Sequence, residues 1–250
     1  MMFSTIILAA GKGTRMKSDL VKVLHPLCGR PLLSYVVETA RSVGSQDISL
    51  IVGYQADAVR EKFPDAGLNF IEQRELLGTG HAVLQAHARF ANYTGDILIL
   101  CGDVPLLQAA TIRALWACHR QEKTAVTVLT TVLTDAAGYG RMVKGPDGKV
   151  VRIVEERDAT EAEKEIKEIN TGIYCVDSRF LFDALRKINN ENAQHEYYLT
   201  DIIAIAHKSG EGVTSLIAAD HREVMGINTP EELSEAHRYL EKRMGPSAED

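Results

Sequence analysis

Short apolar runs alternate with amphipathic stretches along the first half of the chain, and this alternation limits the possible folds. Apolar runs of five or six residues are typical of buried strands, whereas apolar positions three and four residues apart are typical of helices. We predict strands at 4–9, 48–52, 68–72, 97–101 and 125–131, and helices at 31–43, 56–63, 80–90 and 109–120. This spacing predicts an α/β fold: a Rossmann-like, mostly parallel twisted sheet with helices on both faces.

The pattern changes after about residue 133. Strands are predicted at 141–144, 149–155 and 169–176, and a Pro-Asp-Gly turn separates the first two. We expect the strand-rich segment 139–176 to form a lobe inserted beside the sheet. Helices at 180–188, 199–208 and 230–244 and short strands at 213–218 and 224–226 complete the prediction, with a frayed tail at 246–250.

Charge and apolar content exclude several classes of partner. The chain has 250 residues with a formal net charge of −6, which argues against a broad basic surface for nucleic acid. No run approaches the ~20 apolar residues that span a membrane, and no segment has the form of a signal peptide. We therefore expect a cytoplasmic protein with neither a nucleic-acid nor a membrane partner.

The cysteines and histidines show no metal-binding spacing. The four cysteines form no C-x-x-C pair, and the eight histidines form no H-E-x-x-H motif. We predict free thiols in a reducing compartment rather than disulfides or a zinc site. The cysteines are Cys28, Cys101, Cys118 and Cys175.

A glycine-containing loop follows the first predicted strand. Gly11 and Gly13 would let the backbone approach a phosphate, and Lys12 and Arg15 add positive charge. The loop is neither a Walker A loop nor a G-x-G-x-x-G turn, because Met16 stands at the third glycine position. Two interpretations stay open here, a phosphate-binding loop and a tight turn.

Several other residues also allow two interpretations. Lys22, inside an apolar patch, either reaches solvent along its stem or is held over a phosphate. Thr79, between two glycines, is either a helix N-cap or part of an exposed helix start that binds an anion or a base. Asp103 follows a buried strand, and a strand-end carboxylate there favours a Mg²⁺ ligand over a turn residue. Asn228 is either a second ligand or an N-cap.

The predicted sheet also indicates where these residues should meet. Ligands of such sheets bind beyond the carboxyl ends of the strands, so we expect the site at the loops after Ala9, Gln73 and Cys101. Glu155 and Asn170 close apolar strands further along the chain. They could bind sugar hydroxyls and an acetamido group, although pattern alone favours solvation at an edge strand.

The order of the motifs carries a family resemblance. Over about residues 4–244 the chain resembles the uridylyltransferase domain of the bifunctional N-acetylglucosamine-1-phosphate uridyltransferases, which belong to the sugar nucleotidyltransferase superfamily. The first of the matching strings is typical of the wider superfamily, and EINTGIY and EYYLTD point to this narrower family. The strings are LAAGKGTRM, KVLH, LGTGHAV, GDVPLL, GYGR, IVE, EINTGIY, EYYLTDII and GIN.

The resemblance implies an enzyme that transfers UMP from UTP to N-acetylglucosamine-1-phosphate and releases pyrophosphate. It implies Arg15 and Lys22 as the catalytic residues, and Asp103 and Asn228 as ligands of the cofactor Mg²⁺. Gln73 and Gly78 would recognise uracil. The residues implied to bind the substrates are Leu8, Ala10, Gly11, Lys22, Gln73, Gly78, Thr79, Gly140, Glu155, Asn170, Thr171 and Asn228.

The resemblance also divides the chain. We expect a nucleotidyltransferase domain over 1–229, with a nucleotide-binding part to about 133 and a sugar-binding part after it, followed by a helix and tail over 230–250. The acetyltransferase half of the family has no counterpart here, so we expect a monomer, either a fragment or a stand-alone enzyme. Val21 replaces the family's usual proline.

Two rival functions stay open. One is a related enzyme that uses glucose-1-phosphate or another nucleotide. The other is a nucleotide-binding domain without turnover.

Overall fold

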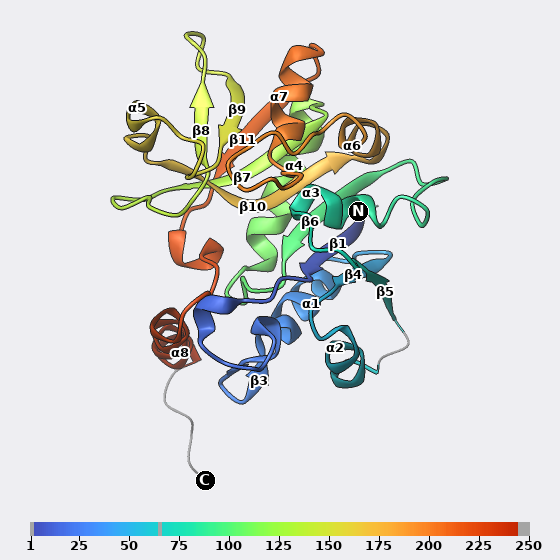
Figure 1. The fold of residues 1–250 in the computed structure, drawn as a ribbon, viewed down its shortest axis with the longest axis vertical. Coiled ribbons are helices and arrows are strands. Elements are labelled where there is room, and N and C mark those ends of the chain that lie inside the picture. Colours follow the sequence, from blue (N-terminus) through green and yellow to red (C-terminus); the bar gives the residue numbers. More distant parts are fainter. Residues whose placement is uncertain (1–2, 65–66, 245–250) are drawn as a thin grey trace.

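A nine-stranded mixed sheet forms the centre of the molecule in a computed structural model that describes residues 3–64 and 67–244 (Figure 1). Seven strands follow the order β11-β7-β10-β6-β1-β4-β5, and the β8-β9 hairpin joins this path through β10. The seven are β1 (Phe3–Ala9), β4 (Ile48–Val52), β5 (Leu68–Glu72), β6 (Asp96–Cys101), β7 (Val126–Val132), β10 (Glu168–Asp177) and β11 (Val213–Ile217).

The strand directions confirm the predicted fold class. The pairs β1–β4, β1–β6, β4–β5 and β7–β11 are parallel, whereas β10 runs antiparallel to both β6 and β7. Leu8 pairs with Cys101 at the carboxyl ends of β1 and β6. Because β10 runs the other way, its beginning lies at this same edge of the sheet, close to the end of β6.

Two layers of helices cover the sheet, and the strand residues alternate between them. Ile6, Ile97 and Ile99 face a cluster that includes residues of α3 (Thr79–Leu84), α6 (Ser178–Leu185) and α7 (Asp201–Lys208). Ile7, Leu98 and Leu100 face the opposite cluster, with residues of α1 (Leu32–Ser42), α2 (Ala56–Lys62) and α4 (Ala109–Glu122). The sheet therefore has a dry core on each face, as the continuous apolar strands predict.

The strand-rich segment differs from its predicted form. β8 (Arg141–Lys144) and β9 (Val150–Val154) form a hairpin that lies near α7 and α5 (Glu161–Lys164) and joins the sheet only through the pairing of β8 with β10 (Figure 1). Thr160 and Glu163 form a capping box, which explains the short helix that was not predicted. The strand predicted at 169–176 was expected in the lobe, but as β10 it belongs to the central sheet.

Several element boundaries also differ. The helix predicted over 80–90 ends at Leu84, and the chain continues in successive i→i+3 turns. The strand predicted at 224–226 is wrong: a 3₁₀ turn, η3 (His221–Val224), ends at Val224, and the two residues after it have no regular structure. The turn begins at His221 because the Asp220 side chain caps it by accepting from the Arg222 amide. Two further 3₁₀ turns, η1 (Thr14–Met16) and η2 (Lys22–Leu24), and a small ladder of β2 (Pro26–Leu27) with β3 (Arg30–Pro31) were not predicted.

Helix α8 (Pro230–Met244) packs on a third, smaller apolar cluster. Its predicted stripe residues Leu233, Ala236 and Leu240 contact this cluster, which includes Leu27 and Ile227. The side chain of Met244 and the tail lie outside the described residues. None of the helices in the described ranges is long and apolar enough to cross a membrane.

The packing of the sheet predicts that shortening one buried strand side chain will strongly lower the free energy of unfolding. Leu98 is 0% exposed, so Leu98→Ala should lower the free energy of unfolding by about 3 kcal/mol through lost burial and a residual cavity. Leu20→Ala, at a side chain 39% exposed, should change it by no more than about 0.5 kcal/mol. Urea unfolding followed by circular dichroism measures both, and equal losses would contradict this packing.

Candidate functional site

A cavity of about 380 Å³ opens at the carboxyl ends of β1 and β6. Its volume lies in the range of small-molecule sites. The loops after Ala9, Glu72 and Cys101 all contribute to it. The predicted site residues that line it are Leu8, Ala10, Gly11, Lys22, Gln73, Gly78, Thr79 and Asp103.

Gly11 and Gly13 of the first loop have different structural roles. Gly13 adopts a left-handed φ of 66°, and a Cβ added there would lie 2.5 Å from Cβ of Lys22. Gly13 is therefore required for close packing against Lys22 as well as for the turn. A Cβ at Gly11 would meet nothing within 4 Å, so the backbone at Gly11 is open to a ligand.

Lys22 joins the two residues that were predicted to bind a metal. Its Nζ forms an ion pair with Asp103 and donates a hydrogen bond of 2.9 Å to Oδ1 of Asn228. The Lys22 side chain is only 16% exposed, so it ends on protein groups and does not reach into solvent. An oxygen of each partner thus points at one cationic centre. Two convergent oxygen donors, one of them charged, suit a hard divalent cation.

The backbone around Asn228 holds this arrangement in place. Asn228 donates its side-chain Nδ2 to the Gly226 carbonyl at 3.1 Å and its backbone amide to Glu232 at 2.6 Å. Glu232 also accepts from the Thr229 amide, and Thr229 Oγ1 accepts from the Glu232 amide. This reciprocal pair is a capping box at the start of α8, so the helix start fixes Asn228. Asn228 itself is not the residue whose side chain caps the helix.

Arg15 does not line the cavity. It belongs to η1 and its side chain is exposed. Burial raises the pKa of Tyr139 to about 12, the negative charges of Glu232 and Asp103 add to the shift, and Arg15 opposes it. Arg15 and Asp103 therefore both influence the phenol of Tyr139, with opposite effects on its pKa. Tyr139 was not singled out from the sequence as an individual residue.

The start of α3 forms the opposite wall of the cavity. Gln73 is 3% exposed, and its Nε2 lies 3.0 Å from both the Gly78 carbonyl and Nδ1 of His81. The helix N-cap is Gly78, so the N-cap interpretation of Thr79 is wrong. Thr79 instead accepts a hydrogen bond of 3.0 Å from the Leu199 amide through its hydroxyl oxygen.

Three of the residues implied to bind the sugar lie together. The Asn170 amide donates to the Gly140 carbonyl at 2.8 Å, and a Cβ at Gly140 would lie 3.4 Å from Oε2 of Glu155. Asn170 lies near the beginning of β10, so the expectation that it closes a strand is wrong. Glu155 lines a neighbouring cavity of about 390 Å³ rather than the one that holds Lys22.

Thr171 is not part of this group through its side chain. It is 7% exposed, and its hydroxyl donates to the Leu129 carbonyl at 2.6 Å inside the sheet. The structure adds Thr200, whose hydroxyl donates to Oε1 of Glu155 at 2.9 Å, and Glu196, which lines the first cavity. Both lie in the segment 195–201. Its motif was recognised in the sequence, but its polar residues received no role there.

Glu155 stands in an unfavourable electrostatic environment. Burial raises the pKa of its carboxyl above the usual value, and the charges of Asp201, Asp158 and Glu196 raise it further. The hydrogen bond from Thr200 opposes this shift because it favours the ionised form.

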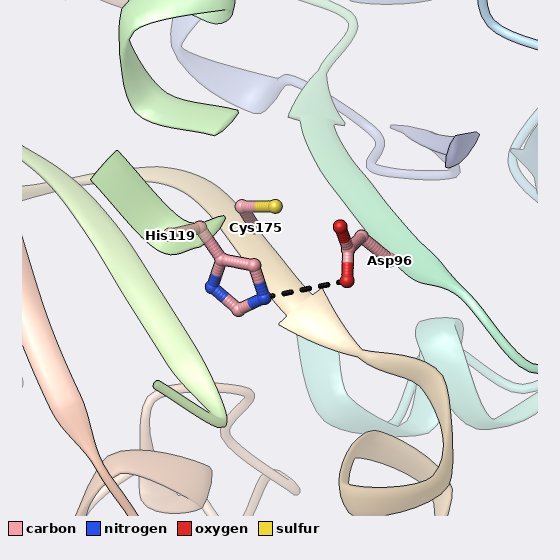
Figure 2. A group of neighbouring side chains, drawn as sticks. All are labelled: Asp96, His119 and Cys175. Atoms are coloured by element: carbon pink, nitrogen blue, oxygen red, sulfur yellow. Dashed lines mark ion pairs between the residues drawn. The ribbon is translucent and has the colours of Figure 1, made fainter. Parts of the chain in front are cut away.

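A possible metal-binding group lies elsewhere, at the opposite end of β6 from Asp103. Ligand atoms of Asp96, His119 and Cys175 lie within 4.8 Å of one another, and all three residues are buried (Figure 2). His119 Nε2 lies 3.5 Å from Asp96 Oδ1, and the indole of Trp116 donates to Asp96 Oδ2 at 2.8 Å. Sequence spacing could not reveal this group because its members come from three separate elements.

The same contacts give this group a structural role. Burial alone would raise the pKa of Asp96, but His119, Trp116 and Arg120 hold it below its usual value. His119 Nδ1 lies 2.9 Å from the Thr127 hydroxyl. The network joins β6, α4 and β7. All four cysteines are free thiols, as predicted.

Comparison with known proteins identifies relatives over nearly the whole chain. Residues 5–196 match the family model of the MobA-like NTP transferase domain. The chain is 52% identical over 242 residues to the bifunctional protein GlmU of Geobacter metallireducens, and 51% identical over 239 residues to that of Brevibacillus brevis. Each match covers 96% of this chain and 51% or 52% of the relative. The chain thus spans about half the length of the curated relatives it matches.

A solved structure shares the fold. A UDP-glucose pyrophosphorylase, solved in complex with UDP-glucose, superposes with a TM-score of 0.77 at 16% identity and covers 97% of this chain. All of that chain is matched. The predicted fold class and the predicted family resemblance are both confirmed by these matches.

The environment of Glu155 predicts a pH-dependent gain of stability on its removal. Because the folded-state pKa is raised, the stabilising contribution of Glu155 is present below its ordinary value of 4.5 and is lost as pH rises through the folded pKa. Glu155→Gln should therefore raise the free energy of unfolding more at pH 7 than at pH 4.5. Urea titrations at both pH values measure this. The exposed Glu61→Gln serves as control, and a Glu155→Gln effect independent of pH would contradict the assignment.

Proposed function

The chain belongs to the MobA-like NTP transferase family, and from this membership we propose that it transfers UMP from UTP to N-acetylglucosamine-1-phosphate, giving UDP-N-acetylglucosamine and pyrophosphate. The single observation that carries the proposal is the convergence of Lys22, Asp103 and Asn228 beside a cavity that the open glycine loop also lines. The identity to the GlmU proteins supports it.

The buried amide of Gln73 supports a uracil base. With Nδ1 of His81 accepting, both protons of Gln73 Nε2 are committed, one to His81 and one to the Gly78 carbonyl. The amide can then offer a ligand only its oxygen, which is an acceptor. Uracil carries a donor at N3, whereas cytosine carries an acceptor there. The amide oxygen can therefore accept from N3 of uracil. Because the 4-amino group of cytosine is also a donor, the comparison of UTP with CTP below decides between the two bases.

The sugar would bind between the lobe and the beginning of β10. The carboxylate of Glu155 can accept hydrogen bonds from sugar hydroxyls, and Thr200 turns one of its oxygens away from them. The Asn170 side chain accepts from the Gly172 amide at 3.0 Å, which leaves its Nδ2 able to donate to an acetamido oxygen. Thr171 would contribute only its backbone.

We assign Mg²⁺ to Asp103 and Asn228, whose oxygens already converge on the Lys22 ammonium. Bound there, the ion would supply positive charge to the reacting phosphates. Lys22 would neutralise charge on the phosphates inside the cavity, and Arg15 would do so at its rim. The attacking sugar phosphate is already anionic near pH 7, so the chain needs no general base. Positioning and charge neutralisation would then carry catalysis of the in-line attack.

A direct test measures pyrophosphate release from UTP and N-acetylglucosamine-1-phosphate, with Mg²⁺ and with a chelator. Parallel reactions replace UTP by CTP, or the sugar phosphate by glucose-1-phosphate. Mg²⁺-dependent release with the first pair at the highest kcat/KM supports the proposal. A clear preference for glucose-1-phosphate or CTP would reassign the substrate, and UTP binding with no release from any pair would indicate a binding domain.

Removal of the Asp103 carboxylate should slow the reaction strongly. Asp103→Ala should lower kcat by ~10²-fold or more, the scale of losing one electrostatic stabiliser. Asp183→Ala, at a carboxylate 67% exposed on α6, provides the matched control and should leave kcat unchanged. An Asp103→Ala enzyme with wild-type turnover would remove the metal assignment.

A further inference from the structure

The ammonium of Lys22 sits at the point where the two proposed metal ligands converge. It contacts Asp103 and Oδ1 of Asn228. These two residues lie 81 and 206 positions after Lys22 in the sequence. A divalent cation bound between Oδ2 of Asp103 and Oδ1 of Asn228 would take the place of the ammonium. Lys22 and the cation therefore cannot both hold these atoms.

The stem of Lys22 is held more firmly than its tip. Cβ, Cγ and Cδ lie within 3.3 Å of the space that a Cβ on Gly13 would fill, so the base of the side chain packs on the loop. Lysine carries its charge on a flexible four-carbon stem. The ammonium can thus swing away from Asp103 while the stem stays packed against Gly13. This movement would bring the ammonium into the cavity, which Lys22 already lines.

We infer that Lys22 acts as an internal cation that occupies the metal site in the free protein and leaves it when the phosphates of a nucleotide enter the cavity. This inference rests on the proposed function, because it takes Asp103 and Asn228 as the metal ligands. In the free protein the ammonium neutralises the Asp103 carboxylate, whose side chain is only 17% exposed. An incoming triphosphate offers the ammonium an alternative anion, and the two oxygens become free for the metal.

Such an exchange couples the two ligands. The nucleotide should raise the affinity for the metal, and by thermodynamic reciprocity the metal should raise the affinity for the nucleotide by the same factor. The protein would bind metal weakly until the nucleotide arrives. Removing the ammonium should tighten metal binding to the free protein and shrink the coupling.

A second lysine provides the control that distinguishes direct competition between Lys22 and the metal from a general effect of positive charge on metal affinity. Lys12 lines the same cavity, and its Nζ lies 5.4 Å from the centroid of the Tyr54 ring. Lys12→Met removes the same charge from the same cavity without vacating the oxygens of Asp103 and Asn228. Lys22→Met removes the charge and vacates them. Lys22→Gln, which keeps polarity and most of the stem, is a second variant at this position.

The experiment measures Mn²⁺ binding to the full chain by the electron paramagnetic resonance signal of free Mn²⁺, without sugar phosphate, and with or without UTP. Circular dichroism checks that each variant is folded. Without UTP, Lys22→Met and Lys22→Gln should bind Mn²⁺ about tenfold more tightly than the wild type, a typical coupling between sites. Lys12→Met should change the affinity much less. UTP should strengthen Mn²⁺ binding to the wild type more than to either Lys22 variant.

Two results would overturn the exchange. One is unchanged Mn²⁺ affinity in both Lys22 variants, and the other is an equal gain in Lys12→Met, which would indicate only a long-range field. Asp103→Ala separates this failure from that of the proposed function. If Asp103→Ala weakens Mn²⁺ binding, the metal assignment is supported even where the exchange fails. If Asp103→Ala leaves the Mn²⁺ affinity unchanged, the metal assignment itself is wrong.

Discussion

The contact of the Lys22 ammonium with Asp103 and Asn228 holds together three segments that are distant in the sequence. Lys22 follows the first strand, Asp103 follows the end of β6, and Asn228 precedes α8. The Ile227 amide also donates to the Asp103 carbonyl at 2.9 Å, so the backbone brings the last two segments together independently of the lysine. One charged contact thus defines the centre of the candidate site, and the backbone around it sets the position of each oxygen.

The sheet determines why these loops meet. Parallel pairing of β1 with β6 brings their carboxyl ends to one edge, where Gly102 donates its amide to the Leu8 carbonyl at 2.9 Å. The reversed direction of β10 then brings its beginning, with Asn170, to the same edge. Lys12 and Lys22 line the first cavity, whereas Glu155 lines another cavity and feels the negative charges of Asp201, Asp158 and Glu196. This division suits phosphates on one side and sugar hydroxyls on the other.

The sequence predicts the parallel strands well because their apolar runs are continuous, as burial on both faces requires. It predicts the extent of β10 to within one residue at each end but not its place in the central sheet, since one strand serves both the lobe and the sheet and no local pattern records that change of partner. The roles of Lys22 and Thr79 depend on hydrogen bonds to residues far along the chain, so periodicity leaves them ambiguous. Thr171 stands beside Asn170 in the same motif, yet the register of β10 shifts between Asn170 and Ile173, and in this irregular stretch the Thr171 hydroxyl donates to the Leu129 carbonyl. The group of Asp96, His119 and Cys175 arises only from tertiary packing.

Two groups in the described part of the chain could thus hold a metal ion, and we assign the functional ion to only one of them. The sharpest test is anomalous diffraction from crystals grown with Mn²⁺ and UTP. We expect an anomalous peak between the side-chain oxygens of Asp103 and Asn228, with the Lys22 ammonium moved onto a phosphate. A peak at Asp96 and His119 alone, with Lys22 still bridging Asp103 and Asn228, would contradict this assignment.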